Sequence, residues 1–338
     1  MAAQTNAPLP DGLEVGGYRI LNKIASGGFS IVYLARDAEG SLCAVKEYLP
    51  STLVRRDPGE LVPVVAPEHM NTYRNGLKCF FEEGRALVRI LHPNVVRVMN
   101  FFRANETVYM VMAYEEGRTL QEVILRWRGR ENRPVIAERH IRKVFHLVMN
   151  GLREVHANRL LHLDIKPANV YLRNDGSPML LDFGAARQAL SQDAPKLFPM
   201  YTPGFAAPEL YRKGEQLGPW TDVYGLGASV FACMLGSPPQ AADQRLISDR
   251  MGELYARLKG NYSESLIELV TWCLKMDPTE RPQSIFALQK ALRASGGEIA
   301  GTDTGPDTRA SGMSRFLDTM AGRLGRRRRA DPAPPLES

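Results

Sequence analysis

The sequence predicts an α+β fold, with a small β-rich part followed by a larger, mostly helical part. Three short alternating or apolar runs, at residues 18–25, 31–37 and 42–49, are separated by glycine-containing breaks, as in an antiparallel meander. From about residue 120 the apolar residues recur at helical spacing. One long amphipathic helix is marked by Ile141, Val144, Phe145, Val148, Met149, Leu152 and Val155.

Length and composition indicate an ordinary globular chain with a polar segment at each end. It has 338 residues, of which 44% are hydrophobic and 24% charged, and this length favours two domains or lobes. We expect a flexible leader at residues 1–17 and a folded unit at 18–293. Within that unit the β-rich part covers about 18–113 and the helical part about 118–293. Residues 294–338, rich in Gly, Thr, Asp and Ser, predict a disordered tail.

Between the first strands and the helical part the pattern changes several times. Residues 50–67 are rich in proline and charge and predict a loop. Helical spacing follows around residues 80–91, and strand character returns in "VVRVMNFF" and "VYMVMAY". Further on, "VYL" and "MLL" predict a hairpin that turns at residues 174–176, while residues 221–235 are apolar nearly all round and predict a buried helix.

The net charge of +6 is concentrated at the C-terminal end. Arg326, Arg327, Arg328 and Arg329 supply much of the excess, so we expect no general basic face for nucleic acid. The tail around this cluster has two interpretations. It is a solvated segment, or it is a basic amphipathic helix that contacts anionic lipid or a partner through Phe316, Leu317, Met320 and Leu324.

Nothing in the sequence indicates export, a membrane span or a cysteine-bound metal. The start has no basic and apolar signal-peptide pattern, and no apolar run approaches the roughly 18 residues that cross a bilayer. The cysteines are far apart and form no CxxC pair, so they predict small buried side chains in a reducing cytoplasm; they are Cys43, Cys79, Cys233 and Cys273.

Seven short motifs, spread along the chain, contain the candidate site residues. They are "IASGGFSIVY" (24–33), "AVKEY" (44–48), "FEEGRALVRILHP" (81–93), "YMVMAYEEG" (109–117), "HLDIKPAN" (162–169), "LLDFGAAR" (180–187) and "TPGFAAPE" (202–209). With these motifs the chain resembles the protein kinases, in particular the eukaryotic-like Ser/Thr kinases of bacteria, over roughly residues 18–292. The resemblance implies the bilobal protein-kinase fold, with a small β-rich N-lobe and a larger helical C-lobe, and ATP and Mg²⁺ as cofactors.

The resemblance places ATP between the lobes. In the glycine-rich motif only Gly27 matches a family glycine, while Ala25 and Ser30 replace two others. Lys46 would hold the α- and β-phosphates and form an ion pair with Glu83. The resemblance also makes Met112 the gatekeeper, assigns adenine to the Ala113 carbonyl and the Glu115 amide, and assigns further nucleotide contacts to Ile24, Val32 and Ala44.

The motif at residues 162–169 supplies the catalytic groups. A carboxylate must orient the attacking hydroxyl and accept its proton, and the resemblance gives this role to Asp164. Lys166 would neutralise charge on the γ-phosphate. Asn169 and Asp182 would bind Mg²⁺. The form "DIKPAN" is the Ser/Thr form of this motif.

Other family positions imply structural roles. The resemblance packs Phe183 between His162 and Leu87. It pairs Glu209 with Arg281 of "DPTERP" (277–282), lets Asp222 of "WTDVYGLG" (220–227) brace the 162–169 motif, and brings Thr202 to the catalytic Asp from the substrate side.

The resemblance predicts an ATP- and Mg²⁺-dependent Ser/Thr kinase that acts on protein substrates and on itself. A pseudokinase scaffold is the alternative, because the glycine motif is altered, and a small-molecule kinase is a third hypothesis. Leu163 stands where kinases regulated by activation-loop phosphorylation carry Arg, so we expect full activity without a phosphate held there, although Ser191, Tyr201 and Thr202 offer hydroxyls. Ala168 weakly argues against a preference for basic substrates.

Overall fold

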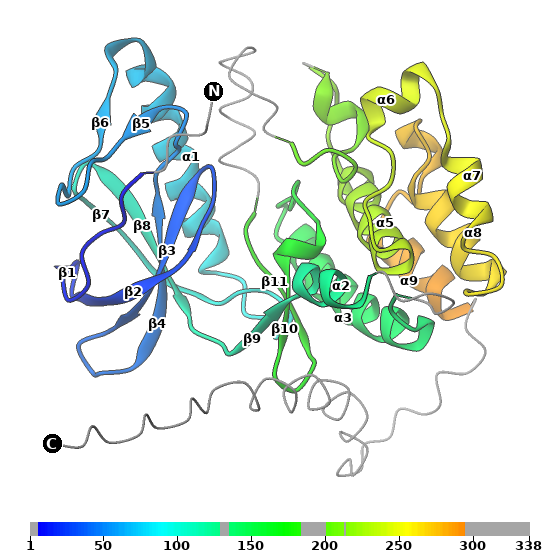
Figure 1. Ribbon diagram of the computed structural model, residues 1–338, viewed down its shortest axis with the longest axis horizontal. Helices are drawn as coiled ribbons and strands as arrows, with labels where there is room; N and C mark the ends of the chain where they lie inside the picture. The colour runs from blue at the N-terminus through cyan, green and yellow to red at the C-terminus, as the bar shows by residue number, and fades with distance from the viewer. Residues whose placement is uncertain (1–5, 129–134, 184–200, 213, 295–338) are drawn as a thin grey trace, which may run out of the picture.

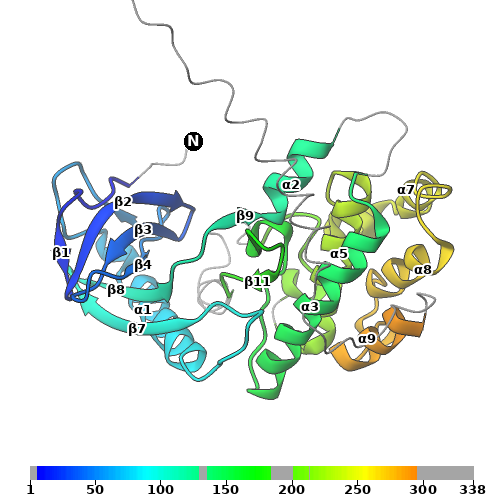
Figure 2. The ribbon, with the colours of Figure 1, turned by 90° about the horizontal axis from the view of Figure 1, so that it is seen from below.

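The chain folds into two lobes in the computed structural model, which describes residues 6–128, 135–183, 201–212 and 214–294. Figure 1 shows the β-rich N-lobe on the left and the helical C-lobe on the right. Figure 2, seen from below, shows the chain passing from β8 to β9 where the lobes join. This arrangement confirms the predicted α+β class with a small β-rich and a larger helical part.

The N-lobe is built on a six-stranded antiparallel sheet with the order β1-β2-β3-β4-β8-β7. Along β3 buried residues alternate with partly exposed ones, as expected for a strand with one face on the core. Asn105 and Glu106 both have positive φ in the tight turn between β7 and β8. The strands are β1 (Glu14–Val15), β2 (Tyr18–Ser26), β3 (Ser30–Arg36), β4 (Leu42–Tyr48), β7 (Val98–Ala104) and β8 (Thr107–Ala113).

One long helix, α1 (Met70–Leu87), packs on this sheet after a short 3₁₀ turn, η1 (Pro67–His69). It begins ten residues before the predicted helical region and ends before Leu91, which is 75% exposed. The early turns bury Tyr73 and Gly76, a spacing of three residues that is too sparse to reveal the helix from sequence.

The described part of the leader is ordered, which corrects the expectation of a flexible segment at residues 1–17. Leu9 is only 2% exposed, and its backbone N–H donates to the Tyr33 hydroxyl at 3.1 Å. Val15 is buried in β1, which pairs with β2. Burial of side chains such as these stabilises by roughly 1.5–3 kcal/mol each, so the leader is held to the sheet by its few apolar residues.

Residues 50–67 are mostly loop, as predicted, but they contain two short antiparallel strands that form a hairpin. Its strands are β5 (Val54–Arg55) and β6 (Val64–Val65). Arg56 leaves this hairpin to form a buried ion pair with Glu47 on β4, with 2.8 Å between Nη2 and Oε2. Both side chains are fully buried, so the hairpin is anchored to the sheet. This ion pair was not predicted, because the sequence alone does not show which of the charged side chains in this segment is buried.

The C-lobe consists mainly of helices and a small three-stranded sheet with the order β11-β10-β9. The strands are β9 (Gly117–Thr119), β10 (Val170–Arg173) and β11 (Pro178–Leu180). The helices are α2 (Leu120–Trp127), α3 (Glu138–Ala157), α5 (Pro219–Leu235), α6 (Ala242–Ile247), α7 (Met251–Ala256), α8 (Glu264–Cys273) and α9 (Ile285–Ala294), with 3₁₀ turns η2 (Pro167–Asn169), η3 (Pro208–Tyr211) and η4 (Pro278–Glu280).

Helix α5 lies at the centre of the C-lobe, as the apolar sequence predicted, and its glycines permit close packing. A Cβ on Gly225 would lie 2.9 Å from the Ile165 carbonyl oxygen, and one on Gly227 would lie 2.4 Å from Cys273 Cβ. These two positions bring α5 directly against the 162–169 segment and against α8.

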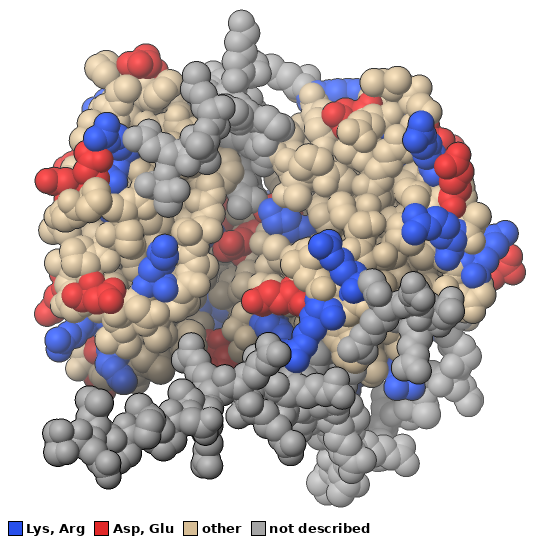
Figure 3. Space-filling model, viewed as in Figure 1, with Lys and Arg blue, Asp and Glu red and all other residues tan. Residues whose placement is uncertain are grey.

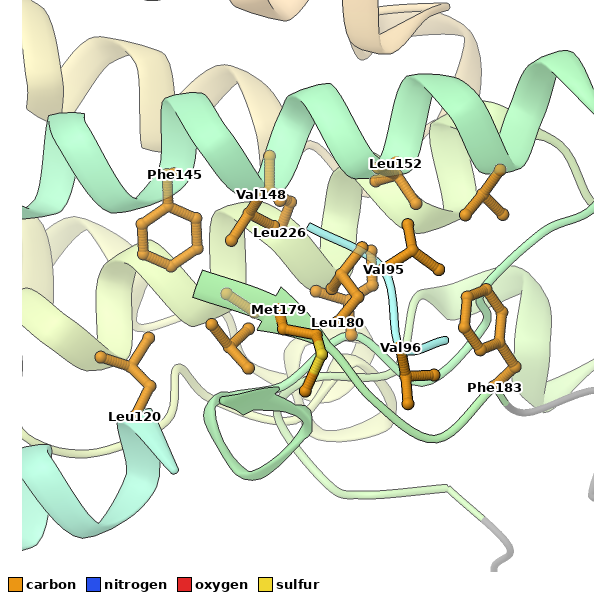
Figure 4. Close-up of a cluster of buried hydrophobic side chains, with 14 of the residues drawn as sticks. Val95, Val96, Leu120, Phe145, Val148, Leu152, Met179, Leu180, Phe183 and Leu226 are labelled. Carbon is orange, nitrogen blue, oxygen red and sulfur yellow. The ribbon is translucent and has the colours of Figure 1, made fainter. Parts of the chain in front are cut away.

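The core of the C-lobe also takes in the segment that leads from α1 to β7. Figure 4 shows Val95 and Val96 among side chains from α2, α3, β11 and α5. The backbone N–H of Val96 donates to the Leu180 carbonyl at 2.9 Å, and the Asn94 side chain donates to the Pro178 carbonyl at 2.7 Å. The end of α1 is therefore tied to the C-lobe.

Two expectations concern parts of the chain that the structure covers only partly. The predicted tail with its arginine cluster lies outside the described residues, apart from Ala294. Within the described ranges, no helix combines the length and the apolar character that a membrane span requires.

Candidate active site

The polar side chains of the loop at residues 162–169 meet at one point. Lys166 Nζ lies 2.9 Å from Oδ2 of Asp164 and donates to its Oδ1 at 3.1 Å. Asn169 Nδ2 donates to the same carboxylate at 2.9 Å and to the Asp164 backbone carbonyl at 2.8 Å. The 3₁₀ turn η2 begins at Pro167 and returns the chain so that Asn169 reaches Asp164. The structure therefore brings together three residues that the sequence placed in one site.

Asp222, at the start of α5, holds the backbone of this loop. Its carboxylate accepts hydrogen bonds from the backbone N–H groups of His162 at 2.9 Å and Leu163 at 2.7 Å. It also lies 2.7 Å from Nε2 of His156 on α3. Leu163 has a φ of +61°, which an L residue adopts at a cost of about 1–2 kcal/mol. The charged hydrogen bonds to Asp222 offset that strain, which confirms the predicted brace.

His162 connects the loop to the segment after β11. Its ring stacks on Phe183 with centroids 4.5 Å apart, and its Nε2 lies 2.9 Å from the Leu181 carbonyl oxygen. Complete burial lowers the pKa of His162 below its usual value, so the ring is neutral at physiological pH and donates from Nε2. The stack of Phe183 on His162 is confirmed, and the contact of Phe183 with Leu87 stays a prediction.

Lys46 has a different partner from the one predicted. Its Nζ forms an ion pair with Oδ1 of Asp182 at 2.8 Å and lies 5.6 Å from the centre of the Phe80 ring. Glu83 is 7% exposed on α1, and no ion pair between Lys46 and Glu83 is found among the described residues. Asp182 lies just after β11 of the C-lobe, and its side chain is 34% exposed.

Asn169 and Asp182 are a suitable pair of ligands for Mg²⁺. Asn169 uses its amide nitrogen for Asp164, and that nitrogen also lies 3.4 Å from the Asp182 backbone carbonyl, so the two residues are neighbours. An amide oxygen and a carboxylate are the hard oxygen donors that Mg²⁺ prefers, usually completed by phosphate and water. In the described ranges no group of three or more His, Cys, Asp or Glu residues could hold a metal ion. Asn169 and Asp182 fit an ion whose other ligands are phosphate and water.

The residues assigned to the nucleotide lie together on neighbouring strands. Val32 on β3 pairs with Lys46 on β4, and Ala44 pairs with Met112 on β8. Ala44 and Met112 are each 8% exposed. Ile24, near the end of β2, is 44% exposed. Figure 3 shows a hollow between the two lobes, with acidic and basic side chains interspersed over the visible face.

The glycine-containing turn between β2 and β3 is open on its outer side. A Cβ added to Gly27 or Gly28 would meet nothing within 4 Å. Its inner side is tied down, because the Gly28 carbonyl accepts a hydrogen bond from the Ser51 backbone N–H at 2.9 Å. The turn therefore has room for phosphates and is connected to the first residues of the 50–67 segment.

The segment that joins the lobes offers backbone groups to a base. The Ala113 N–H donates to the Arg97 carbonyl at 2.9 Å, which leaves its carbonyl as the group assigned to adenine. Glu115 is positioned by two contacts with β10. The Tyr171 hydroxyl donates to the Glu115 carbonyl at 3.2 Å, and Arg173 Nε lies 3.2 Å from Glu115 Oε2.

The segment at residues 201–212 approaches the loop from the substrate side. Lys166 Nζ donates to the Thr202 hydroxyl at 2.8 Å, so Thr202 is joined to Asp164 through a shared ammonium. Glu209 forms a buried bidentate pair with Arg281, at 2.8 and 3.0 Å, which confirms the predicted pairing. Arg281 also lies 5.0 Å from the centre of the Tyr224 ring. Ser191 lies outside the described residues.

Sequence reasoning missed two residues that support the site. His156 holds Asp222, but a lone histidine on an amphipathic helix gives no signal of that role. Ser51 holds the glycine turn from a segment that was taken as a loop. Both contacts join positions that are distant in sequence, so only the fold reveals them.

Comparison with known proteins gives consistent matches. The family model described as "Protein kinase domain" matches residues 18–293. The solved structure "PpkA-294 apo form" is 33% identical with a TM-score of 0.75, and the match covers 85% of this chain and 100% of that one.

Curated relatives are longer proteins. "Serine/threonine-protein kinase PkaA" of Streptomyces coelicolor is 30% identical over 71% of this chain and 44% of its own length. "Probable serine/threonine-protein kinase PkwA" of Thermomonospora curvata is 26% identical over 91% of this chain and 37% of its own length. The chain thus spans less than half the length of these relatives.

Proposed function

Because the chain belongs to the protein kinase domain family, we propose that it transfers the γ-phosphate of ATP to Ser and Thr hydroxyls of protein substrates, including its own. The observation that carries this proposal is the network of Asp164, Lys166, Asn169 and Thr202, in which every link is between 2.8 and 3.1 Å.

Each group in the network has a role that follows from its chemistry. The Asp164 carboxylate accepts the proton of the attacking hydroxyl and orients that oxygen toward the phosphorus. Lys166, which already lies beside Asp164 and Thr202, neutralises charge on the transferred phosphoryl group. Thr202 marks where the substrate backbone passes, since its hydroxyl shares the Lys166 ammonium.

The nucleotide is held by groups from both lobes. Lys46 binds phosphate oxygens from the N-lobe, and Asn169 and Asp182 are the residues that would hold Mg²⁺. An ion held there would offset the negative charge of the phosphates. Lys46 therefore exchanges part of its present contact with Asp182 for phosphate, and the Phe80 ring beneath it stays in place.

The pseudokinase alternative gains no support from the comparisons, since the curated relatives are named as serine/threonine kinases. A scaffold without transfer activity has no need for a lysine placed between the Asp164 carboxylate and a substrate-side hydroxyl. The small-molecule kinase hypothesis is weakened by the Thr202 contact, which belongs to a platform for an extended chain.

Transfer of labelled phosphate tests the proposal. Purified protein, γ-labelled ATP, Mg²⁺ and a general acceptor protein should give label on Ser and Thr, shown by phosphoamino-acid analysis. Asp164→Asn should reduce the rate by about 10²–10⁴-fold, because the carboxylate base is lost. Equal labelling by both proteins, or none by the wild type while nucleotide still binds, would reject transfer and favour the scaffold. Rapid phosphorylation of a metabolite alone would favour the third hypothesis.

We also propose a cytoplasmic location. Cys43, Cys233 and Cys273 are buried free thiols, as expected in a reducing compartment. Contact of the basic tail with anionic lipid or an acidic partner is likewise a proposal, and vesicle co-sedimentation of the full chain against one truncated after Ala294 tests it.

A further inference from the structure

The described start of the chain, residues 6–9, is bound to Arg56, which lies 50 positions after Asn6. The Asn6 side-chain oxygen accepts a hydrogen bond from the Arg56 backbone N–H at 2.8 Å. The Ala7 N–H donates to the Arg56 carbonyl at 3.0 Å, and Arg56 Nε donates to the Ala7 carbonyl at 2.9 Å. Both backbone polar groups of Arg56 are therefore satisfied by the leader. We name residues 6–9 together with Arg56 the leader clasp.

The Arg56 side chain fixes the leader clasp to the central sheet. Its Nη2 donates to the Glu47 carboxylate on β4 at 2.8 Å and to the Tyr33 hydroxyl on β3 at 3.1 Å. The hydroxyls of Tyr33 and Tyr109 donate to the same carboxylate at 2.7 and 2.9 Å. The side chains of Arg56 and Glu47 are fully buried. A buried network in which these groups satisfy one another favours a single arrangement, so Arg56 is held in one position relative to the sheet.

The segment just before the leader clasp holds the glycine-containing turn between β2 and β3. The Leu49 N–H donates to the Phe29 carbonyl at 2.8 Å, and the Ser51 N–H donates to the Gly28 carbonyl at 2.9 Å. The Ser51 hydroxyl also donates to the Gly28 carbonyl, at 3.3 Å. Figure 1 shows this turn at the same end of the N-lobe as β5. Two successive carbonyls of the turn are thus held by residues 49–51.

The link from Ser51 to Arg56 is short and ordered. The N–H groups of Leu53 and Val54 both donate to the Pro50 carbonyl, at 2.9 and 3.0 Å, which closes a tight turn. The side chains of Leu53 and Val54 are buried, each 4% exposed. Because this turn is closed and its side chains are buried, the position of Arg56 determines the position of Ser51.

The two bonded carbonyls determine where N–H groups of the glycine-containing turn point. None of the described peptide bonds is cis. In a trans peptide unit the carbonyl of one residue and the N–H of the next point in opposite directions. The N–H groups of Phe29 and Ser30 therefore point away from residues 49–51. Successive backbone N–H groups at a turn are suitable donors for phosphate oxygens.

We propose that the leader clasp is a positioning element for ATP, which holds the glycine-containing turn, through Ser51, where its N–H groups receive the phosphates. This inference rests on the nucleotide binding of the proposed kinase function, and it adds that residues outside the nucleotide site set the affinity. A turn released from the clasp must be ordered when phosphate binds, which weakens binding. The base is not affected, because the groups assigned to adenine are backbone groups of Ala113, at the end of β8, and of Glu115 beyond it.

Isothermal titration with two ligands tests the proposal. ATP with Mg²⁺, and separately adenosine, are titrated into the full-length protein carrying Asp164→Asn, so that turnover does not disturb the measurement. Adenosine has the base and no phosphate. The ratio of the two dissociation constants therefore isolates the contribution of the phosphates, and adenosine binding also shows that each variant is folded around its nucleotide site.

The link at Ser51 can be cut without removing the turn that contains it. Ser51 is the second residue of the turn closed by Pro50 and Leu53, a position that proline favours, so Ser51→Pro keeps this turn and removes both donors to the Gly28 carbonyl. We expect Ser51→Pro to weaken ATP binding by about fivefold to tenfold, the equivalent of about one hydrogen bond, and to leave adenosine binding unchanged. Ser51→Ala keeps the N–H and should restore the ATP affinity to within about twofold of the parent protein.

Two results with Ser51→Pro would overturn the proposal. The first is an unchanged affinity for ATP, which would mean that the turn needs no support from residue 51. The second is an equal loss of affinity for ATP and adenosine, which would mean that the substitution damages the whole site and does not act on the phosphates.

A substitution in the leader tests the clasp itself. Leu9 is 2% exposed and its N–H donates to the Tyr33 hydroxyl, so the buried carboxylate of Leu9→Asp should detach the leader and weaken ATP binding by about threefold or more. Pro8→Asp adds the same charge at the neighbouring exposed position and should change the affinity by less than about twofold. Equal losses in the two variants would indicate repulsion by the added charge and reject the clasp.

A double-mutant cycle identifies the route from the leader to the nucleotide. If the leader acts through Ser51, adding Leu9→Asp to Ser51→Pro should weaken ATP binding by less than about twofold beyond Ser51→Pro alone. Additive losses would mean that the leader acts on the phosphates by another route, which would overturn the positioning through Ser51.

The assay with labelled ATP separates this proposal from the proposed kinase function. Absence of transfer by the wild type would reject the kinase function and leave the two dissociation constants measurable. In active protein, Leu9→Asp should raise the KM for ATP by the factor found in the titration and change kcat by less than about twofold, because only binding is weakened. A lower kcat with an unchanged KM would overturn the positioning role.

Discussion

Lys46 and Asp182 form an ion pair of 2.8 Å that joins the central sheet of the N-lobe to the end of β11 in the C-lobe. The Lys46 side chain is 8% exposed and that of Asp182 34% exposed, so the pair lies at the inner edge of the space between the lobes. Both groups are also the ones that ATP and Mg²⁺ would contact. In this structure the two groups assigned to ATP and Mg²⁺ thus neutralise each other's charge.

Removing either member of this pair should impair transfer in distinguishable ways. Lys46→Met should lower kcat/KM by about 10²–10³-fold, because a buried cation that contacts phosphate is lost. Asp182→Asn should lower it by a similar factor and also abolish the dependence of ATP binding on Mg²⁺, which isothermal titration measures. Lys143→Met, an exposed change on α3, serves as the control and should have no effect. Unaltered turnover in Lys46→Met would contradict the assigned role.

The pair of Glu209 and Arg281 should be a major contributor to stability. Its side chains are 2% and 0% exposed and form two short hydrogen bonds. Arg281→Met leaves a buried carboxylate without its partner and should lower the free energy of unfolding by about 3–5 kcal/mol, measured in urea.

A matched control lies nearby on the surface. Arg212 and Glu215 are 55% and 45% exposed and 3.6 Å apart, so Arg212→Met should change stability by less than about 1 kcal/mol. If both variants unfolded at the same urea concentration, the buried pair would contribute no more to stability than the exposed pair. The assignment of Glu209 as an anchor of the substrate platform would then fail.

Acid should destabilise the protein through His162. Burial lowers the pKa of this ring in the folded state, so below the unfolded value of about 6.5 the unfolded chain binds a proton that the folded chain does not. The stability contributed by the neutral ring is complete above that pH and declines as the pH falls through it. Urea unfolding from pH 8 to pH 5 should show this decline.

The contribution of His162 can be isolated by substitution. In His162→Leu the decline should be shallower by up to about 1.4 kcal/mol per pH unit, the value for one proton. His92, His140 and His146 also have lowered pKa values, but they are present in both proteins. The difference in slope between wild type and His162→Leu therefore reports on His162. Identical slopes would mean that burial does not lower the pKa of His162 in the folded protein.

The catalytic loop was predictable because its geometry is local. Asp164, Lys166 and Asn169 lie within six residues, and the proline-initiated turn that brings them together is encoded in the same stretch. The first three long strands of the N-lobe and helices α3 and α5 followed from the pattern of apolar residues, and the pairing of Glu209 with Arg281 followed from the resemblance. Each of these features could be predicted from a local pattern or from a motif of the family.

The features that sequence did not predict depend on contacts between distant segments. Arg56 is one of many charged residues near the 50–67 segment, and nothing local distinguishes it as the one buried against Glu47. The leader was misjudged because nothing local marks Leu9 and Val15 as buried or reveals the backbone hydrogen bond from Ala7 to Arg56. The partner of Lys46 depends on how α1 and the end of β11 are placed relative to β4, which no motif encodes.

Leu163 should make activity independent of a phosphate on the activation segment. Its side chain packs against the hydrophobic core and carries no charge, and its N–H is bound to Asp222, so the loop is held without help from a phosphate. Phosphatase-treated wild type and Ser191→Ala should therefore keep kcat within about twofold of the untreated protein in the labelled-ATP assay, since no arginine–phosphate contact is removed. Glu253→Gln, an exposed change on α7, gives the baseline for an inert substitution. Loss of activity in Ser191→Ala that Ser191→Asp restores would show that another cation takes the place of the missing arginine, and that the Asp222 brace alone does not hold the loop in its active form.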